Sequence, residues 1–453
     1  MKAAYEAVRE FLSEPRLPRM AQRTFRFHLG YAILDATSGG IISIMPVVAI
    51  KEMGAPDWQL GLSLTLSGVG MLATLYLSSW MAHRPKMPFV FLPGIACAFC
   101  TALMAAAHSS FSFLFLAGLG LMFQTMSRPA ITAVLRLNYP ATHRGVATGE
   151  IRKWSSLYYL LALLISANLL DLATQEQVCR MSLARALVLL AGAMSLASYF
   201  CFQRIRVRES SDGMKRDLKP RFVQTLREAV RVIGHDGRYR RYVLACFVFG
   251  FSGLLYVSYI PAFLEKDLHF GYSECALLID VIPLLAAFIT TGFLGSWFDR
   301  TNPWKAWAWV RFGWGLDPIL LAVTLVCAAK FPAAAVLLPV LGRISRGSVQ
   351  GGSWVLWWQV GVNHFARHVE DTSRYQGILV FFNGLIRLTA PAIGAWILAA
   401  SDSSRSLLFL VGGLGVLLSG LYSWRQARRE ETNPALSTIA DFEAAYAGRI
   451  QRQ

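Results

Sequence analysis

Long apolar segments recur along the whole chain and constrain its fold more than any other feature. A helix that crosses the hydrocarbon core of a bilayer needs about 20 mostly apolar residues. Only 16% of the residues are charged, whereas soluble domains average about a quarter. We therefore expect an all-α membrane protein. Its twelve predicted spans are residues 29–50, 58–82, 88–107, 111–135, 154–176, 181–202, 241–263, 274–298, 304–328, 333–361, 375–399 and 405–424.

The longest polar segment separates the sixth span from the seventh and is rich in arginine and lysine. This position predicts a linker between two halves of six spans each. The predicted units are an N-terminal bundle over 1–202, a linker over 203–240, a C-terminal bundle over 241–424 and a tail over 425–453.

Basic residues gather on one predicted side of the membrane. If the N-terminus lies in the cytoplasm, the cytoplasmic segments hold about 33 of the 44 lysines and arginines, as the positive-inside rule requires. The net charge of +17 thus has a topological explanation, and it also suits attraction to anionic lipid. We expect a multi-pass protein of the bacterial inner membrane with both termini in the cytoplasm, a lipid bilayer as partner and no nucleic-acid partner.

Residues that often carry catalysis form no group in this sequence. The 7 cysteines lack the spacing of metal ligands, and the 8 histidines are scattered, mostly in predicted loops. The P-loop pattern that binds nucleotide phosphates is missing, which argues against ATP-driven transport. We expect no metal, no cofactor and no enzymatic activity.

The two halves repeat a short pattern after their second spans. The first copy reads SSWMAHRPK over 78–86, and the second reads GSWFDRTNPWK over 295–305. The offset between Arg84 and Arg300 also carries Arg128 to within a residue of Arg343. Duplication on this scale is typical of transporters, because a site between two repeats can open to alternate sides of the membrane.

The second copy resembles the loop motif of the major facilitator superfamily, a Gly followed by Asp-Arg and basic residues. The first copy departs from it, with Ser79 and His83 in place of the usual Gly and Asp. The segment from Asn138 to Gly145 resembles the stretch after the family's fourth helix. The resemblance implies two pseudo-symmetric six-helix bundles, secondary transport by alternating access, and a monomer.

Four residues of these loops are predicted to act in gating: Asp299, Arg300, Arg84 and Arg144. Asp299 and Arg300 can make charge-assisted hydrogen bonds to neighbouring helices in one conformation and lose them in another. The alternative is that the basic residues only keep their loops in the cytoplasm. The fifth span lacks the Gly-Pro pattern of the family's antiporters, which argues against drug–proton antiport.

Two opposite charges are predicted at similar depth inside the membrane. Asp35 and Arg128 lie about 10 Å from the cytoplasmic ends of their helices, at about 1.5 Å per residue. The resemblance implies that their helices, the first and fourth, line a central cavity. Because charges within spans usually face the protein interior, we predict that they meet or face each other across this cavity. The alternative is a buried pair that only fixes helix packing.

The predicted helix interiors carry six arginines and three aspartates, an excess that would attract anions. Arginine supplies a rigid forked donor set, and tryptophan supplies stacking and apolar area. We therefore predict a small anionic or amphipathic substrate. The alternative for each tryptophan is a place in the core or against lipid. The predicted substrate-binding residues are Arg128, Arg343, Arg346, Gln124, Trp354 and Tyr256.

Asp35, Asp317 and Arg387 are predicted to form ion pairs or to couple transport to protons, because alternating access can change the surroundings of a carboxylate. Asp280 is expected near the outer end of its span, where its side chain could reach the interface. The sequence thus predicts a proton-coupled secondary transporter, with import and export both open. The alternative is an accessory, assembly or lipid-handling protein that uses the same fold.

Overall fold

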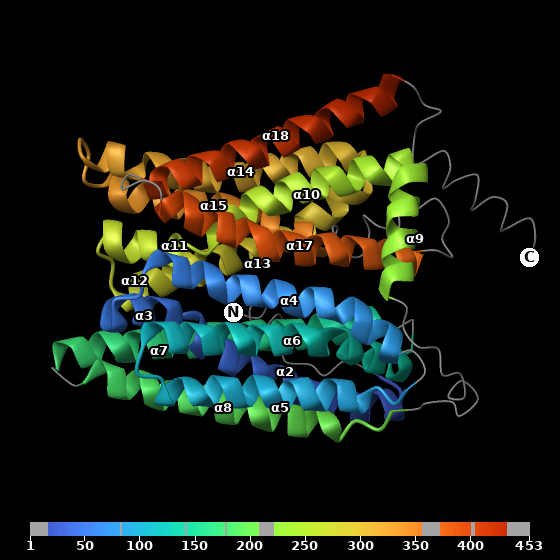
Figure 1. The fold of residues 1–453 in the computed structure, drawn as a ribbon, viewed down its shortest axis with the longest axis horizontal. Coiled ribbons are helices and arrows are strands. Elements are labelled where there is room, and N and C mark those ends of the chain that lie inside the picture. Colours follow the sequence, from blue (N-terminus) through green and yellow to red (C-terminus); the bar gives the residue numbers. More distant parts are fainter. Residues whose placement is uncertain are drawn as a thin grey trace, which may run out of the picture.

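In the computed structural model of this chain, two bundles of long helices lie side by side (Figure 1). The N-terminal bundle, blue to green, occupies the lower half of the view, and the C-terminal bundle, yellow-green to red, occupies the upper half. The structure describes residues 17–81, 84–140, 143–176, 179–207, 222–355, 372–399 and 404–432.

Each bundle is built from helices that follow one another along the chain. The N-terminal bundle contains α2 (Arg19–Ser43), α3 (Met45–Met53), α4 (Asp57–Met81), α5 (Met87–Leu103), η1 (Met104–Ala106), α6 (Ser110–Asn138), α7 (Arg144–Gln175) and α8 (Arg180–Gln203). The C-terminal bundle contains α10 (Gly237–Val257), α11 (Ile260–Ala262), η3 (Phe263–Asp267), α12 (Tyr272–Ala276), η4 (Leu277–Val281), α13 (Ile282–Asp299), α14 (Pro303–Ala328), α15 (Ala334–Val355), α17 (Thr372–Ala399) and α18 (Ser404–Thr432).

Within the described residues, ten helical stretches are long and apolar enough to cross a membrane. The other two predicted spans, 58–82 and 333–361, correspond to α4 and α15. Helices suit this environment because every backbone hydrogen bond is satisfied within the segment. The prediction of an all-α, multi-pass membrane protein is confirmed.

The span boundaries differ from the prediction where proline and glycine interrupt the helices. The first span begins at Arg19 and breaks at Ile44, because Pro46 in the first turn of α3 lacks the N–H needed to continue α2. Gly54 then ends α3 in the left-handed region, at φ 63°. The predicted linker also contains a helix, α9 (Phe222–His235), which lies across the ends of the long helices in Figure 1.

The buried apolar residues form three clusters that show where the bundles meet. One cluster joins both bundles and includes Ile44, Val48 and Phe113 together with Tyr256 and Phe263. The other two each belong to a single bundle. The shared cluster lies around α3, α11 and α12, and we call this end of the molecule the closed end (Figure 1). The opposite end lies near α9, and we call it the linker end. The two bundles therefore share a core at the closed end and have separate cores toward the linker end.

A close crossing of α4 and α17 also joins the bundles. A Cβ added at Gly68 would lie 2.6 Å from the backbone nitrogen of Leu388. Because backbone cannot move aside as a flexible side chain can, only glycine permits this approach. Next to this crossing, Arg387 of α17 donates a hydrogen bond of 3.4 Å to the hydroxyl of Ser67 in α4.

Candidate functional site

A cavity of about 560 Å³ lies between the bundles and takes most of its lining from the N-terminal one. This volume is within the range of pockets that hold small organic ligands. Asp35, Ser38, Gly39 and Ile42 recur at helical spacing and bring one face of α2 to the cavity. Much of the remaining wall is apolar, with Met104, Leu114, Leu121, Val257 and Ile279 among its residues.

Asp35, Gln124 and Arg128 are the predicted site residues that line this cavity. Gln124 and Arg128 are four residues apart on α6 and therefore share a helix face. The Gln124 amide lies 3.5 Å from an Asp35 carboxylate oxygen, and the Arg128 side chain is exposed. Among the described residues, no ion pair within 4.0 Å involves either Asp35 or Arg128. The two charges thus interact electrostatically across the cavity without forming a direct ion pair.

A second group of predicted residues comes together inside the C-terminal bundle, away from the lining of the cavity. Arg343 of α15 forms an ion pair with Asp317 of α14, and both side chains are almost completely buried. The Tyr256 hydroxyl lies 3.4 Å from the same carboxylate. Arg346 lies 3.9 Å from Asp317 and 4.6 Å from the centre of the Trp314 ring. The charged side chains of this cluster, Asp317, Arg343 and Arg346, therefore contact one another.

The predicted gating residues occupy varied surroundings. Arg144 donates hydrogen bonds of 3.0 and 3.1 Å to the carbonyls of Arg136 and Tyr139, at the end of α6, where unpaired carbonyls favour a cation. Arg84 lies 5.0 Å from the ring centre of Trp80, and Arg300 is exposed. The side chains of Asp299 and Trp354 lie outside the described residues.

The Asp280 carboxylate contacts side chains of the N-terminal bundle, a pairing that was not predicted from the sequence. The carboxylate accepts hydrogen bonds from Ser43 of α2 and from Tyr159 of α7, the latter at 2.7 Å. Both partners line the central cavity and belong to the opposite bundle. The intramembrane carboxylate was the available signal, but the sequence could not show which helix it faces.

Charged contacts also join the bundles at the closed end. Asp57, the first residue of α4, accepts hydrogen bonds from Lys266 at 2.7 Å and from Arg405 at 2.8 Å. Burial alone would raise the pKa of Asp57, but these two cations outweigh it and hold its pKa below the ordinary value. Nearby, Glu52 accepts a hydrogen bond of 2.6 Å from the Tyr272 hydroxyl. These pairings could not be predicted from the sequence, because their partners lie near the ends of helices that are far apart in the chain.

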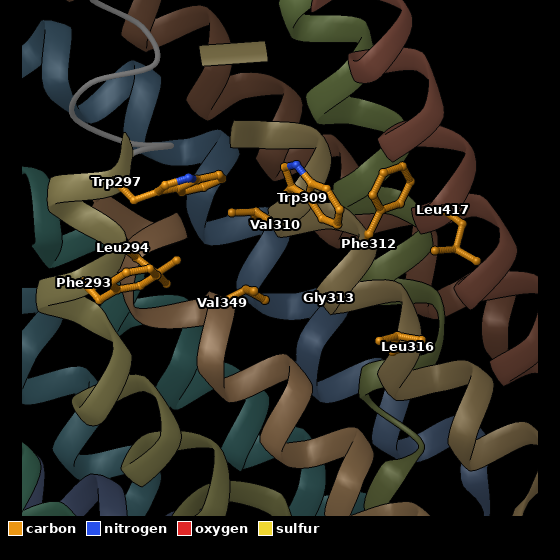
Figure 2. A pocket seen from close by; sticks show the side chains of 10 residues that line it. All are labelled: Phe293, Leu294, Trp297, Trp309, Val310, Phe312, Gly313, Leu316, Val349 and Leu417. Atoms are coloured by element: carbon orange, nitrogen blue, oxygen red, sulfur yellow. The ribbon is translucent and has the colours of Figure 1, made fainter. Parts of the chain in front are cut away.

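A different, almost entirely apolar cavity of about 660 Å³ lies in the C-terminal bundle. Figure 2 shows Phe293 and Trp297 lining it beside Trp309, Phe312 and Leu417. Phe293 is 71% exposed and Trp309 is 52% exposed, so this cavity is a groove on the side of the bundle. Its lining lacks charged groups and therefore offers contact only to apolar ligands.

Two transporters of known structure have a similar arrangement of helices. A mutant of the nucleoside transporter NupG has a TM-score of 0.69 and 10% identity, covering 89% of this chain and 99% of its own. A bacterial homologue of the human lysosomal transporter Spinster, in an inward-facing and unoccupied conformation, has a TM-score of 0.58 and 15% identity, covering 91% of this chain and 96% of its own. At these identities the likeness shows the fold alone.

Sequence comparison gives the family. No curated protein matches this sequence. The family model described as the Major Facilitator Superfamily matches residues 27–370, about three quarters of the chain. The chain therefore belongs to the major facilitator superfamily.

Proposed function

We propose that this protein is a secondary transporter that moves a small organic anion or amphipathic solute through the central cavity by alternating access. The observation that carries this proposal is Arg128, an exposed residue that lines a largely apolar cavity and forms no ion pair within 4.0 Å among the described residues. A fixed cation beside apolar surface complements a molecule with one anionic group and an apolar body.

The contacts of the other intramembrane arginines also support a single anion site at Arg128. Arg343 and Arg346 lie beside Asp317, and Arg311 donates to Ser423 in the core of the C-terminal bundle. Arg128 is therefore the arginine of the predicted set that lines the cavity and forms no ion pair within 4.0 Å among the described residues. The charged residues of the cavity lining are one aspartate and one arginine, so the excess of positive charge predicted for the helices does not extend to the cavity.

The proposal includes proton coupling through Asp35. Its carboxylate has one weak hydrogen-bond partner, Gln124 at 3.5 Å, and no ion pair within the described residues. A carboxylate that is not paired with a fixed cation can bind and release a proton as the cavity changes sides. Under the predicted topology, the linker end faces the cytoplasm and the closed end faces outward.

Ligand binding to purified protein tests the anion site. A thermal-shift screen of organic anions should identify ligands that stabilise the wild type, and Arg128→Gln should weaken their binding by about 2 kcal/mol, about thirtyfold. Arg84→Gln is the matched control, since Arg84 lies against Trp80 outside the cavity. Equal binding by wild type and Arg128→Gln would exclude Arg128 as the anion site.

Uptake into liposomes tests the proton role. Asp35→Asn should abolish uptake driven by a pH gradient and leave substrate counterflow intact, because counterflow requires no net proton movement. Normal pH-driven uptake by Asp35→Asn would show that Asp35 does not carry the proton.

The lateral groove favours a second candidate function, the handling of lipid. Its apolar lining and its opening on the side of the bundle suit an acyl chain. Movement of labelled phospholipid between liposome leaflets distinguishes the two candidates. A lipid-handling protein would lose this activity in Trp309→Ala and keep it in Arg128→Gln, whereas a solute transporter would show no such lipid movement.

A further inference from the structure

Asp280 lies at a point where three helical segments from both bundles meet. It belongs to the π-helical turn η4, in the C-terminal bundle, and its Oδ2 accepts hydrogen bonds from Ser43 of α2 and Tyr159 of α7. A π-helical turn is uncommon and changes the direction of the side chains around it. Since Ser43 and Tyr159 also line the central cavity, water and protons in the cavity can approach this contact.

The charged and titratable groups around Asp280 include no cation in ion-pair contact within the described residues. Arg346 of α15 interacts electrostatically with Asp280, but the carboxylate in ion-pair contact with Arg346 is that of Asp317. On α12, the Glu274 carboxylate accepts a hydrogen bond from the backbone N–H of Gly271. The helix α13 carries no charged residue before its last position, Asp299.

Hydroxyl partners make this carboxylate different from Asp317. Asp317 contacts two arginines. Asp280 instead has two hydroxyl groups as partners, and both donate to the same oxygen. An ionised carboxylate accepts both bonds strongly, whereas a protonated carboxyl is a weaker acceptor and has an O–H of its own to satisfy.

We propose that Asp280 links proton binding to the opening of the closed end. The ionised carboxylate holds η4 to α2 and α7 and keeps the bundles together there. Protonation weakens both hydrogen bonds and favours separation of the bundles, so that opening of the closed end takes up a proton. The inference rests on the proposed alternating access, and it assigns to Asp280 a role distinct from that of Asp35 in the cavity.

A buried cysteine beside this contact provides a direct test of opening. Cys275 lies on α12 and is completely buried in the cluster that the bundles share. In a variant that keeps Cys275 as its single cysteine, the maleimide labelling rate is divided at each pH by the rate of the same variant unfolded in urea, because maleimide reacts with the thiolate and its fraction falls with pH. This labelling ratio should be low at about pH 8 and higher at about pH 5. Asp280→Asn, which stays neutral, should give a ratio about tenfold higher than this parent at about pH 8, and the ratio should depend little on pH.

Two further variants separate opening from other effects. Ser67→Ala removes a different contact between the bundles, the hydrogen bond from Arg387, and should keep the pH dependence of Cys275 labelling. A second parent keeps Cys246 as its single cysteine, which lies in the separate core of the C-terminal bundle. In this parent Cys246 should stay unlabelled after Asp280→Asn if the protein remains folded. If Cys246 becomes labelled, Tyr159→Phe and Ser43→Ala replace Asp280→Asn, and each should give faster Cys275 labelling at about pH 8.

The labelling experiment does not depend on the substrate. Equal labelling of Cys275 in Asp280→Asn and its parent, with the same pH dependence, would overturn the role of Asp280. The same holds if neither hydroxyl variant changes the labelling rate. A pH-dependent response of Cys275 in a protein that binds no anion would instead contradict the proposed substrate and leave the inference on Asp280 intact.

Discussion

The ion pair between Asp317 and Arg343 allows a quantitative test of the C-terminal bundle. The two side chains are 0% and 1% exposed, and Arg346 and Tyr256 lie beside the same carboxylate. Asp317→Asn keeps the shape of the side chain but leaves the buried Arg343 without a counter-ion. Removing one partner of a buried ion pair costs about 3–5 kcal/mol of unfolding free energy. We expect a loss in this range, measured by chemical unfolding of the purified protein in micelles.

An exposed pair and a double variant complete this experiment. Lys305 and Glu431 lie 3.9 Å apart and are 43% and 54% exposed, so Glu431→Gln should cost less than about 1 kcal/mol. The double variant Asp317→Asn/Arg343→Gln removes both charges and should recover at least half of the loss caused by Asp317→Asn alone, because coupling within such pairs is large.

Transport by the double variant distinguishes a packing role from the predicted role in proton coupling. A folded double variant that still transports would show that the pair mainly fixes α14 against α15. If Asp317→Asn costs less than about 1 kcal/mol and stops pH-driven uptake, the structural explanation is refuted, and Asp317 takes part in coupling.

Two further predictions concern contacts between the bundles. Because Lys266 and Arg405 lower the pKa of Asp57, its contribution to the closed end is present at neutral pH and is lost as pH falls below about 4. Asp57→Asn should therefore raise the Cys275 labelling ratio, normalised to the unfolded protein, at neutral pH and lessen its further rise below pH 4. A ratio identical to that of the single-cysteine parent would contradict this. Gly68→Ala should lower thermal stability by about 1–3 kcal/mol, whereas Gly292→Ala, with no atom within 4 Å of the added Cβ, should not. Equal melting of both variants would contradict the close crossing of α4 and α17.

Hydropathy and helical spacing are local properties, and they predicted much of the fold. The apolar segments gave the all-α membrane class, and the duplicated loop pattern gave the family. The shared depth of Asp35 and Arg128 placed both on the same cavity, with Gln124 on the same face of α6 as Arg128. These features depend on residues within one helix or on the repeat itself, so no knowledge of distant contacts was required.

Local irregularities were outside the reach of the same reasoning. The break at Ile44 shortens the first long helix, and the π-helical turns η3 and η4 interrupt the seventh and eighth spans. A π-helical turn changes hydrogen-bond register without changing apolar composition, so hydropathy does not detect it. Asp280 lies within η4, and hydropathy could not show that it contacts Ser43 and Tyr159 of the opposite bundle.

The sequence by itself determined that this chain spans a membrane as two related helical bundles. In lipid, a long apolar segment satisfies its backbone hydrogen bonds internally by forming a helix. Only the tertiary structure decided which intramembrane charges are available. Asp317 pairs with Arg343, Asp280 contacts Ser43 and Tyr159, and Arg128 remains exposed in the cavity. The charge of each residue is written in the sequence, but its partner is set by side chains from helices far away in the chain, which packing alone brings together.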